Sequence, residues 1–392
     1  MSIAQAQPNT ARTTERVVRL LVMVALALFS AWTILGEYPR VLGEHGLWDF
    51  GAFVASGRAA AEGLSPYGIY PPLTPHVVFP GFEAWNPNLN PPISALLFQL
   101  FDLAPLDVSF RVWMWISIGL YAIAVLLLVL RFARSLEGVV IALWAFALAG
   151  FWDTVYLGQI YTPLVLATVG AWLLLERGQA VWAGILIGIV VAMKPNFLVW
   201  PVLLFLAGYR VPTLVCIATA AIISAIPLFA FGPGIYVEWL KLVASDSERA
   251  IFLTNGSFAG FAARIGMPIL GTVLSAALLL GLAAWAFWRR PTAMRASAFG
   301  LLAALLASPL GWIHYTLFLL PVLLAYWDRK LIWVVAAILV VPVTFIIGQF
   351  GKEASVQVTV GSLYGWGLVL CLLVLLFEEW KSRASAPASL RA

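Results

Sequence analysis

The sequence predicts an all-α polytopic membrane protein, and three observations support this fold class. Of the 392 residues, 62% are hydrophobic and only 10% are charged, which is more apolar surface than a soluble domain can bury. Apolar runs of roughly 20 residues, the length needed to cross a bilayer, recur along the chain. The 18 tryptophans suit the headgroup level at the ends of such runs. The net charge of +5 comes from basic residues clustered in short loops, so it indicates topology and not nucleic-acid binding.

The first apolar run covers residues 17–36, with Arg12 and Arg16 before it and Arg19 in its first turn. It is too long for the core of a signal peptide and has no convincing cleavage site, so we expect an uncleaved helix that runs outward from the cytoplasm. Residues 37–107 then form a long extracytoplasmic loop. This loop contains the apolar stretch PPISALLFQLF, which is too short to cross a bilayer.

The run over residues 180–209 predicts a broken hairpin and not one helix. It begins beside Arg177 and ends beside Arg210, which should lie on the same side, and Lys194-Pro195 interrupts it near the middle. Each half of about 15 residues would extend about 22 Å, which is less than the roughly 30 Å of a hydrocarbon core. We therefore expect this hairpin to dip into the membrane from the cytoplasmic side.

The remaining spans are assigned by the same length criterion, with an outer turn at Gly158. This scheme gives about twelve transmembrane or half-membrane helices, with both termini and about fifteen of the 23 basic residues in the cytoplasm. Residues 1–380 form a single domain, and residues 381–392 form a disordered cytoplasmic tail. The expected spans lie near residues 108–130, 138–157, 160–175, 211–231, 267–288, 296–308, 310–327, 331–348 and 361–380.

Two ionisable residues inside apolar runs are candidates for a functional site. A charge at mid-bilayer costs about 2.5–3.5 kcal/mol on insertion scales, so Lys194 at a helix break indicates a polar cavity. Its alternative interpretation is a lysine that extends to the interface or pairs with an internal acid such as Asp153. His314 follows a Ser-Pro break in SPLGWIHYTLF. A lone histidine near an interface is often only a structural residue.

Other polar residues are placed in the predicted outer loops. Asn255, Ser257 and Arg264 lie in TNGSFAGFAARIG, and the same pattern also fits a capped, solvated turn before a helix. Gln159 follows Gly158 and is ambiguous by itself. Asp49 precedes a helix-like run, FGAFVASGRAAAEG, closed by Gly63, so it is either the N-cap of that helix or a carboxylate exposed to a membrane-side cavity.

Five stretches resemble one enzyme family, in the same order along the chain. They are WDFGAFVASGRAAAEGLSPYGIY, NPPISALLFQLF, GQIYTPLVLATVGAWLLLERGQAVWAGILIGIVVAMKPNFLVWPVLL, NGSFAGFAAR and ASPLGWIHYTLFLLPVL. Together they resemble the GT87 family of GT-C glycosyltransferases, typified by mycobacterial polyprenyl-phosphate-mannose-dependent α-1,2-mannosyltransferases. Two positions depart from the family pattern. Asn90 stands where an aromatic residue often precedes the paired prolines, and Tyr315 stands where a second histidine often occurs.

The resemblance implies a GT-C fold and a role for each candidate residue. Asp49 would take the proton from an attacking hydroxyl as the sugar C1 is displaced from phosphate, in a single inverting step. Lys194, His314 and Arg264 would stabilise the phosphate leaving group. No metal or other cofactor is implied. Asn255, Ser257, Gln159 and Tyr67 would contact the substrates.

The implied partners are a polyprenyl-phosphate sugar donor, a glycolipid or lipid-linked glycan acceptor, and membrane lipids. The implied location is the plasma (inner) membrane, with the active site on the periplasmic or extracytoplasmic side. A lipid or solute transporter or flippase is the alternative, because broken helices and membrane lysines occur there too. A scaffold protein is a further alternative. Neither the acceptor nor the sugar is identified by the sequence, and mannose is favoured only by resemblance.

Overall fold

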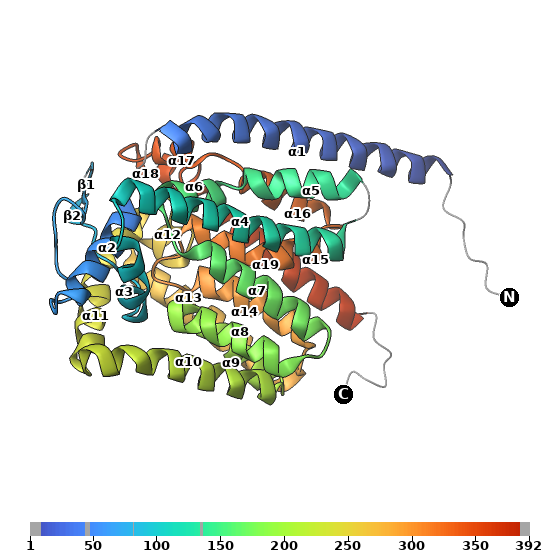
Figure 1. The fold of residues 1–392 in the computed structure, drawn as a ribbon. Helices are drawn as coiled ribbons and strands as arrows, with labels where there is room; N and C mark the ends of the chain where they lie inside the picture. The colour runs from blue at the N-terminus through green and yellow to red at the C-terminus, as the bar shows by residue number, and fades with distance from the viewer. Residues whose placement is uncertain (1–8, 44–47, 81, 134–135, 385–392) are drawn as a thin grey trace.

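The computed structural model describes residues 9–43, 48–80, 82–133 and 136–384, and these are mostly helical. Figure 1 shows an elongated helical body, with α1 (Asn9–Gly43) along one edge. At one end lie α2 (Trp48–Ala61), α3 (Ile93–Phe98), α11 (Gly234–Ser245) and a hairpin. The hairpin pairs β1 (His76–Phe79) with β2 (Phe82–Trp85) in antiparallel register. The start of α1 and the end of α19 (Leu363–Ala384) lie at the opposite end of the body.

Five helical segments of the described residues are long and apolar enough to cross a membrane. Four are α4 (Leu106–Phe132), α10 (Arg210–Phe231), α13 (Pro268–Arg289) and α19, and the fifth begins in α1. A sixth results if α5 (Leu136–Ala147) and α6 (Ala149–Leu157), which bend by 46° at Leu148, count as one span. The prediction of an all-α membrane protein is thereby confirmed.

Several expected boundaries differ from the structure. The first helix continues past residue 36 to Gly43, and an ion pair of 2.7 Å between Glu37 and Arg40, one turn apart, lies in this extension. Residues 381–384 are helical and not disordered, since α19 ends at Ala384, and residues 385–392 lie outside the described residues.

The expected span 310–327 is shorter in the structure and begins as a 3₁₀ helix, and the expected span 331–348 is interrupted. The first consists of the 3₁₀ helix η4 (Ile313–Leu319) and α15 (Leu320–Ala325), and the second of α16 (Lys330–Ile338) and α17 (Val343–Ile347). Pro342 directly precedes α17, where a proline cannot donate the hydrogen bond that a continuing helix needs. The other apolar helices of the described residues have 17 residues or fewer, so five or six segments qualify as full spans by length. The count of about twelve transmembrane or half-membrane helices stays a prediction.

The broken hairpin is confirmed as a local structure. Helix α8 (Ala180–Met193) ends at Lys194, whose φ of −141° and ψ of 84° are not helical. The chain then forms the 3₁₀ helix η2 (Pro195–Leu198) and α9 (Val199–Leu206). Gly184 faces Pro212 and Gly188 faces Cys216, so α8 and α10 run parallel. The chain must therefore return through η2 and α9 to the side where α8 began.

The core surrounds α14 (Ala293–Leu306), which is buried over residues 296–306. Gly300 brings α14 against Trp200 of α9, where an added Cβ would lie 2.8 Å from the Trp200 Cα. The Trp200 indole also donates to Ser297 at 2.8 Å. Small residues that allow helices to approach closely are the usual means of packing helices in lipid. The remaining elements are α7 (Tyr161–Glu176), η1 (Gln99–Asp102), η3 (Ser247–Ile251), α12 (Phe258–Arg264) and α18 (Ala354–Val358).

Candidate active site

Asp49 lies in the first turn of α2, and both of its carboxylate oxygens accept hydrogen bonds from carboxamides. Asn86 donates to Oδ1 at 2.8 Å, and Gln159 donates to Oδ2 at 2.6 Å. Asp49 is the second residue of α2, and these contacts are with side chains. The N-cap interpretation therefore does not account for its environment. The predicted helix after Asp49 is confirmed, as is the glycine that follows it, since Gly63 has a φ of 74°.

Gly158 brings Gln159 to Asp49. It ends α6 in the left-handed conformation, with a φ of 69°, which favours glycine. An added Cβ at Gly158 would lie 2.6 Å from the Cβ of Phe50, the residue after Asp49. The turn between α6 and α7 can therefore pack this closely against α2 only with glycine. Gln159 is 8% exposed, and its Oε1 has no hydrogen-bond partner among the described residues.

Lys194 lies at the break between α8 and η2 and is 9% exposed. Its ammonium donates to Oδ1 of Asn90 at 2.7 Å and to the Tyr161 hydroxyl at 3.0 Å. The same nitrogen lies 4.6 Å from the ring centroid of Tyr161 and 5.6 Å from that of Tyr315. These partners differ from the expected alternative, Asp153. Asn90 and Tyr315, the two departures from the family pattern, therefore both lie against Lys194.

His314 stacks on the other aromatic neighbour of Lys194. Its ring lies 4.7 Å from the ring of Tyr161, at an interplanar angle of 17°. Its Nδ1 is 3.0 Å from Oδ2 of Asp153, a charge-pair distance without hydrogen-bond geometry. Tyr161 thus has the histidine on its face and the lysine at its hydroxyl. Tyr161 lies two residues after Gln159, which donates to Asp49, so these contacts join Asp49, Lys194, His314 and Asp153 into one cluster.

Tyr67 reaches this cluster indirectly. Its hydroxyl donates to the backbone oxygen of Asn90 at 3.1 Å, and Tyr67 is 9% exposed. Asn88 accepts two hydrogen bonds from Asn90, from its backbone and its side chain, both at 3.0 Å. The loop before α3 therefore holds the Asn90 side chain in place beside Lys194.

A separate buried hydrogen-bond network lies beside the segment that precedes η4. It is formed by Arg264, Asn255 and Ser257. Arg264 donates to Ser362 Oγ at 2.9 Å, to the Phe252 carbonyl at 2.7 Å and to the Asn255 carbonyl. The Asn255 carboxamide donates to the Pro309 carbonyl and accepts from the backbone N–H groups of Ser257 and Gly311. Ser257 caps α12 by accepting from the Gly260 N–H. These side chains hold the backbone that leads into η4.

Three further residues were not singled out as site residues from the sequence. Asn86 bonds directly to Asp49, Tyr161 connects Lys194 and His314, and Arg249 donates to Asn86. The cluster of asparagines and prolines in WNPNLNPP is the sequence signal that points to Asn86. Tyr161 lies two residues after Gln159, so the predicted outer turn at Gly158 is the sequence signal that points to it. Among the described residues, no group of three His, Cys, Asp or Glu side chains forms a possible metal site.

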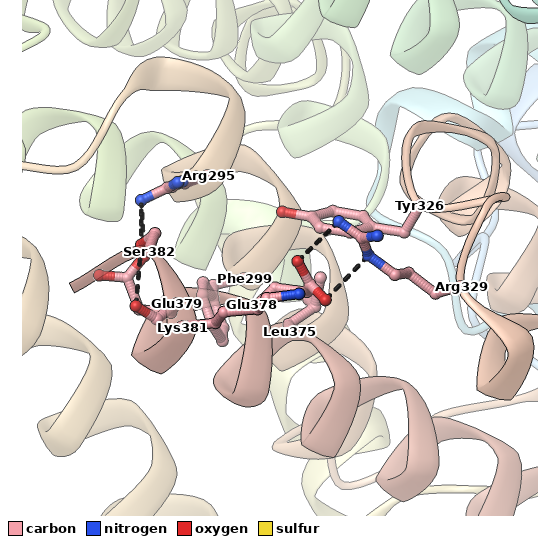
Figure 2. A pocket seen from close by; sticks show the side chains of 9 residues that line it. All are labelled: Arg295, Phe299, Tyr326, Arg329, Leu375, Glu378, Glu379, Lys381 and Ser382. Atoms are coloured by element: carbon pink, nitrogen blue, oxygen red, sulfur yellow. Dashed lines mark hydrogen bonds and ion pairs between the residues drawn. The ribbon is translucent and has the colours of Figure 1, made fainter. Parts of the chain in front are cut away.

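A cavity of about 340 Å³ lies away from this cluster, between the start of α14, the α15–α16 turn and the end of α19 (Figure 2). Glu378 pairs with Arg329 at 2.8 Å, and Glu379 pairs with Arg295 at 3.1 Å. These ion pairs join the ends of helices at the opposite end of the body from α2. The cavity is therefore not part of the candidate active site.

The apolar helices and the buried cluster of ionisable side chains together define the class of protein: a polytopic membrane protein with a polar site between its helices. The model of glycosyltransferase family 87 matches residues 88–309, more than half of the chain. The chain therefore belongs to glycosyltransferase family 87, as its motifs predict.

The chain is 28% identical over 222 residues to a polyprenol-phosphate-mannose-dependent alpha-(1-2)-phosphatidylinositol mannoside mannosyltransferase of Mycolicibacterium smegmatis. The match covers 49% of this chain and 50% of that protein, so the chain spans about half the length of the relative it matches. No solved structure matches the chain.

Proposed function

We propose that this protein is a membrane glycosyltransferase that transfers a sugar from a polyprenyl-phosphate donor to a glycolipid or lipid-linked glycan. The sugar is proposed to be mannose, as in the name of the mycobacterial relative. The observation that supports this most directly is the position of Asp49. Its carboxylate is held by Asn86 and Gln159, next to the cluster that contains Lys194 and His314.

In the proposed reaction, Asp49 is the general base. Its carboxylate takes the proton of the acceptor hydroxyl, whose oxygen forms a bond to the sugar C1. The bond between C1 and the phosphate oxygen breaks at the same time, and the electron pair leaves with the polyprenyl phosphate. Two of the four lone-pair positions of the carboxylate are used by Asn86 and Gln159, which leaves room for the proton. One displacement inverts the anomeric centre, from a β-linked donor to an α-linked product.

Lys194 and His314 are the proposed cations for the leaving phosphate. Lys194 uses two of its three N–H donors on Asn90 and Tyr161, so one donor remains for a phosphate oxygen. His314 is the second group that we place at the phosphate, and its Nδ1 lies 3.0 Å from Oδ2 of Asp153. Arg264 was expected to belong to this set. Because its Nη1 and Nη2 groups donate to two carbonyls and Ser362, we propose that it positions the backbone before η4.

The residues expected to contact the substrates also divide into those that can contact a substrate and those that hold the site in place. Gln159 is the residue we place against the acceptor, because its unpartnered, buried Oε1 can accept a hydrogen bond from a sugar hydroxyl. Tyr67 is proposed to orient Asn90. Asn255 and Ser257, whose polar groups contact backbone atoms, are proposed to support the segment that carries His314.

We further propose a GT-C fold, formed as a single domain by residues 1–380, with the reaction on the extracytoplasmic side of the plasma membrane. The bias of basic residues toward one set of loops supports this orientation. Under it, α2 and the hairpin belong to the first outer loop, and both chain termini lie in the cytoplasm.

The test is to incubate the purified protein with labelled polyprenyl-phosphate mannose and native membranes, and to analyse the labelled lipids. Transfer of label to a glycolipid is expected in the wild type and not in Asp49→Asn. Uptake of a solute into vesicles without any lipid donor, combined with no labelled product, would contradict the proposal and favour a transporter.

A further inference from the structure

Arg249 is a buried cation on the 3₁₀ helix η3, and it is 6% exposed. Its guanidinium makes three kinds of contact. Nε pairs with Asp246 at 2.5 Å, Nη2 donates to the Trp85 carbonyl at 2.7 Å, and Nη1 donates to Oδ1 of Asn86 at 2.9 Å. The pair with Asp246 already balances its charge, so the contacts with the end of β2 serve a second purpose.

The contact with Arg249 fixes which way the Asn86 carboxamide points. Arginine only donates hydrogen bonds and an ionised carboxylate only accepts them. Oδ1 of Asn86 therefore faces Arg249, and Nδ2 faces Asp49 at 2.8 Å. If the amide turned over, its NH₂ would meet the guanidinium and its oxygen would meet the carboxylate. Both contacts would then be lost.

The backbone holds Asn86 between these two charges. Its N–H donates to the Pro75 carbonyl at 2.9 Å, next to the paired residues His76 and Trp85. Asn86 itself is 8% exposed, so solvent does not replace its partners. The other groups that act on Asp49 are Gln159 by hydrogen bond and Asp153, His314 and Lys194 by charge. Asp49 thus accepts one hydrogen bond from Asn86 and one from Gln159, and the contact with Arg249 orients the Asn86 donor.

We propose that Arg249 is a positioning residue for Asp49, acting through the carboxamide of Asn86. The inference rests on the proposed function only in calling Asp49 the general base, since the contacts themselves do not depend on it. The alternative is that Arg249 only fastens the β hairpin to η3, through Trp85 and Asp246. The two ideas differ in what the Asp49 carboxylate experiences when Arg249 is replaced.

An infrared measurement tests the relay without any activity. The carboxylate stretching band of Asp49 is obtained by subtracting the spectrum of Asp49→Asn from that of the wild type. We expect this band to shift in Asn86→Leu, and to shift in the same direction in Arg249→Gln. An unchanged band in Arg249→Gln, with a shifted band in Asn86→Leu, would overturn the inference.

Arg249→Lys serves as a second variant if Arg249→Gln does not fold. Lysine keeps the charge beside Asp246 but lacks the planar fork that reaches both the Trp85 carbonyl and Asn86. A shift of the band in the same direction, smaller than in Asn86→Leu, is expected. A band identical to that of the wild type would again count against the relay.

A cycle of turnover measurements, with labelled polyprenyl-phosphate mannose, tests the consequence for the reaction. We expect Arg249→Gln to lower turnover by roughly 10- to 100-fold, the loss that follows removal of one hydrogen bond to an ionised group. In the Asn86→Leu background the same change should cost less than about threefold, since the relay is already broken. An equal loss in both backgrounds would show that Arg249 acts only on the fold.

Two controls complete this design. Arg111 is exposed and pairs with Asp107 on α4, so Arg111→Gln should leave both the band and the turnover unchanged. Thermal midpoints identify any variant that is simply unfolded. If the wild type transfers no sugar, the proposed function fails, and the infrared band alone still decides whether Arg249 positions Asp49.

Discussion

Nε2 of Gln159 lies 2.6 Å from Oδ2 of Asp49, although 110 residues separate them in the chain. The contact joins the first turn of α2 to the turn between α6 and α7. It depends on the left-handed glycine before Gln159, because a side chain at Gly158 would meet Phe50. A turn residue with special backbone requirements therefore delivers a hydrogen bond to the proposed general base.

Replacement of Asp49 by asparagine tests the proposed base. The oxygen of the introduced carboxamide can still accept from Asn86, and Gln159 can turn its amide so that its free Oε1 accepts from the introduced NH₂ group. The fold should therefore tolerate the change, whereas no group remains to take the proton. We expect turnover to fall by roughly 10²–10⁴-fold with little change in donor affinity or thermal midpoint.

The matched control for this variant is Asp107→Asn, since Asp107 is an exposed residue that pairs with Arg111 on α4. It should keep full turnover. An Asp49→Asn enzyme with wild-type turnover would remove Asp49 from the mechanism.

Gln159→Met tests the acceptor contact at constant side-chain length. The variant loses the donor to Asp49 and the buried acceptor Oε1. We expect turnover to fall by about 10-fold and the KM for the acceptor lipid to rise, because a hydrogen bond to a charged group contributes about 1.5–3 kcal/mol. The exposed Gln179 provides the control Gln179→Met. A rise in the KM for the donor alone would contradict the proposed contact between Gln159 and the acceptor.

Features set by local rules could be predicted from the sequence. The break at Lys194-Pro195, the helix that ends before Gly63 and the turn at Gly158 all follow from the backbone preferences of proline and glycine. The same holds for Ser257, which caps α12 as serine commonly does.

Contacts that depend on tertiary packing could not be predicted in this way. Asn86 contacts Arg249 across 163 residues, and although WNPNLNPP points to the asparagine, nothing in the sequence pairs it with this arginine. Residues 310–327 are also predicted as one apolar span, yet Ile313–Leu319 within it form a 3₁₀ helix that contains His314. Hydrophobicity alone does not distinguish a continuous helix from a broken one.

Lys194→Met tests the proposed phosphate cation. The methionine keeps most of the apolar stem, and the Tyr161 hydroxyl retains its interaction with Tyr315. The protein should therefore fold, while its affinity for the polyprenyl-phosphate sugar falls by at least about 10-fold, as expected for loss of a charge-assisted hydrogen bond. Lys194→Arg should recover only part of this affinity, because the planar guanidinium fits a point-charge site poorly. The exposed Lys241 supplies the control Lys241→Met, and equal affinities in both methionine variants would make Lys194 structural.

The proposed orientation is tested by cysteine labelling. Cys216 and Cys371 are buried, so single cysteines at Ser65 and at Gln179 should report with little background. Ser65 lies in the proposed outer loop and Gln179 in the turn before α8, and both are exposed. A membrane-impermeant maleimide applied to intact cells should label Ser65→Cys and not Gln179→Cys. Labelling of both to the same extent would contradict the orientation.

Gly158→Ala tests whether the close packing of the α6–α7 turn against α2 is needed for activity, with Gly178→Ala as its control. Both glycines have a positive φ, 69° and 72°, so each alanine costs about 1–2 kcal/mol of backbone strain. An added Cβ at Gly178 has no atom within 4 Å, whereas at Gly158 it lies 2.6 Å from the Phe50 Cβ. Gly158→Ala should therefore lose a further ~1–3 kcal/mol of stability through overpacking. Because relief of this clash moves Gln159 away from Asp49, Gly158→Ala should also lose turnover, while Gly178→Ala keeps it. Equal thermal midpoints and equal turnover in the two variants would show that the contact between the turn and α2 is not required.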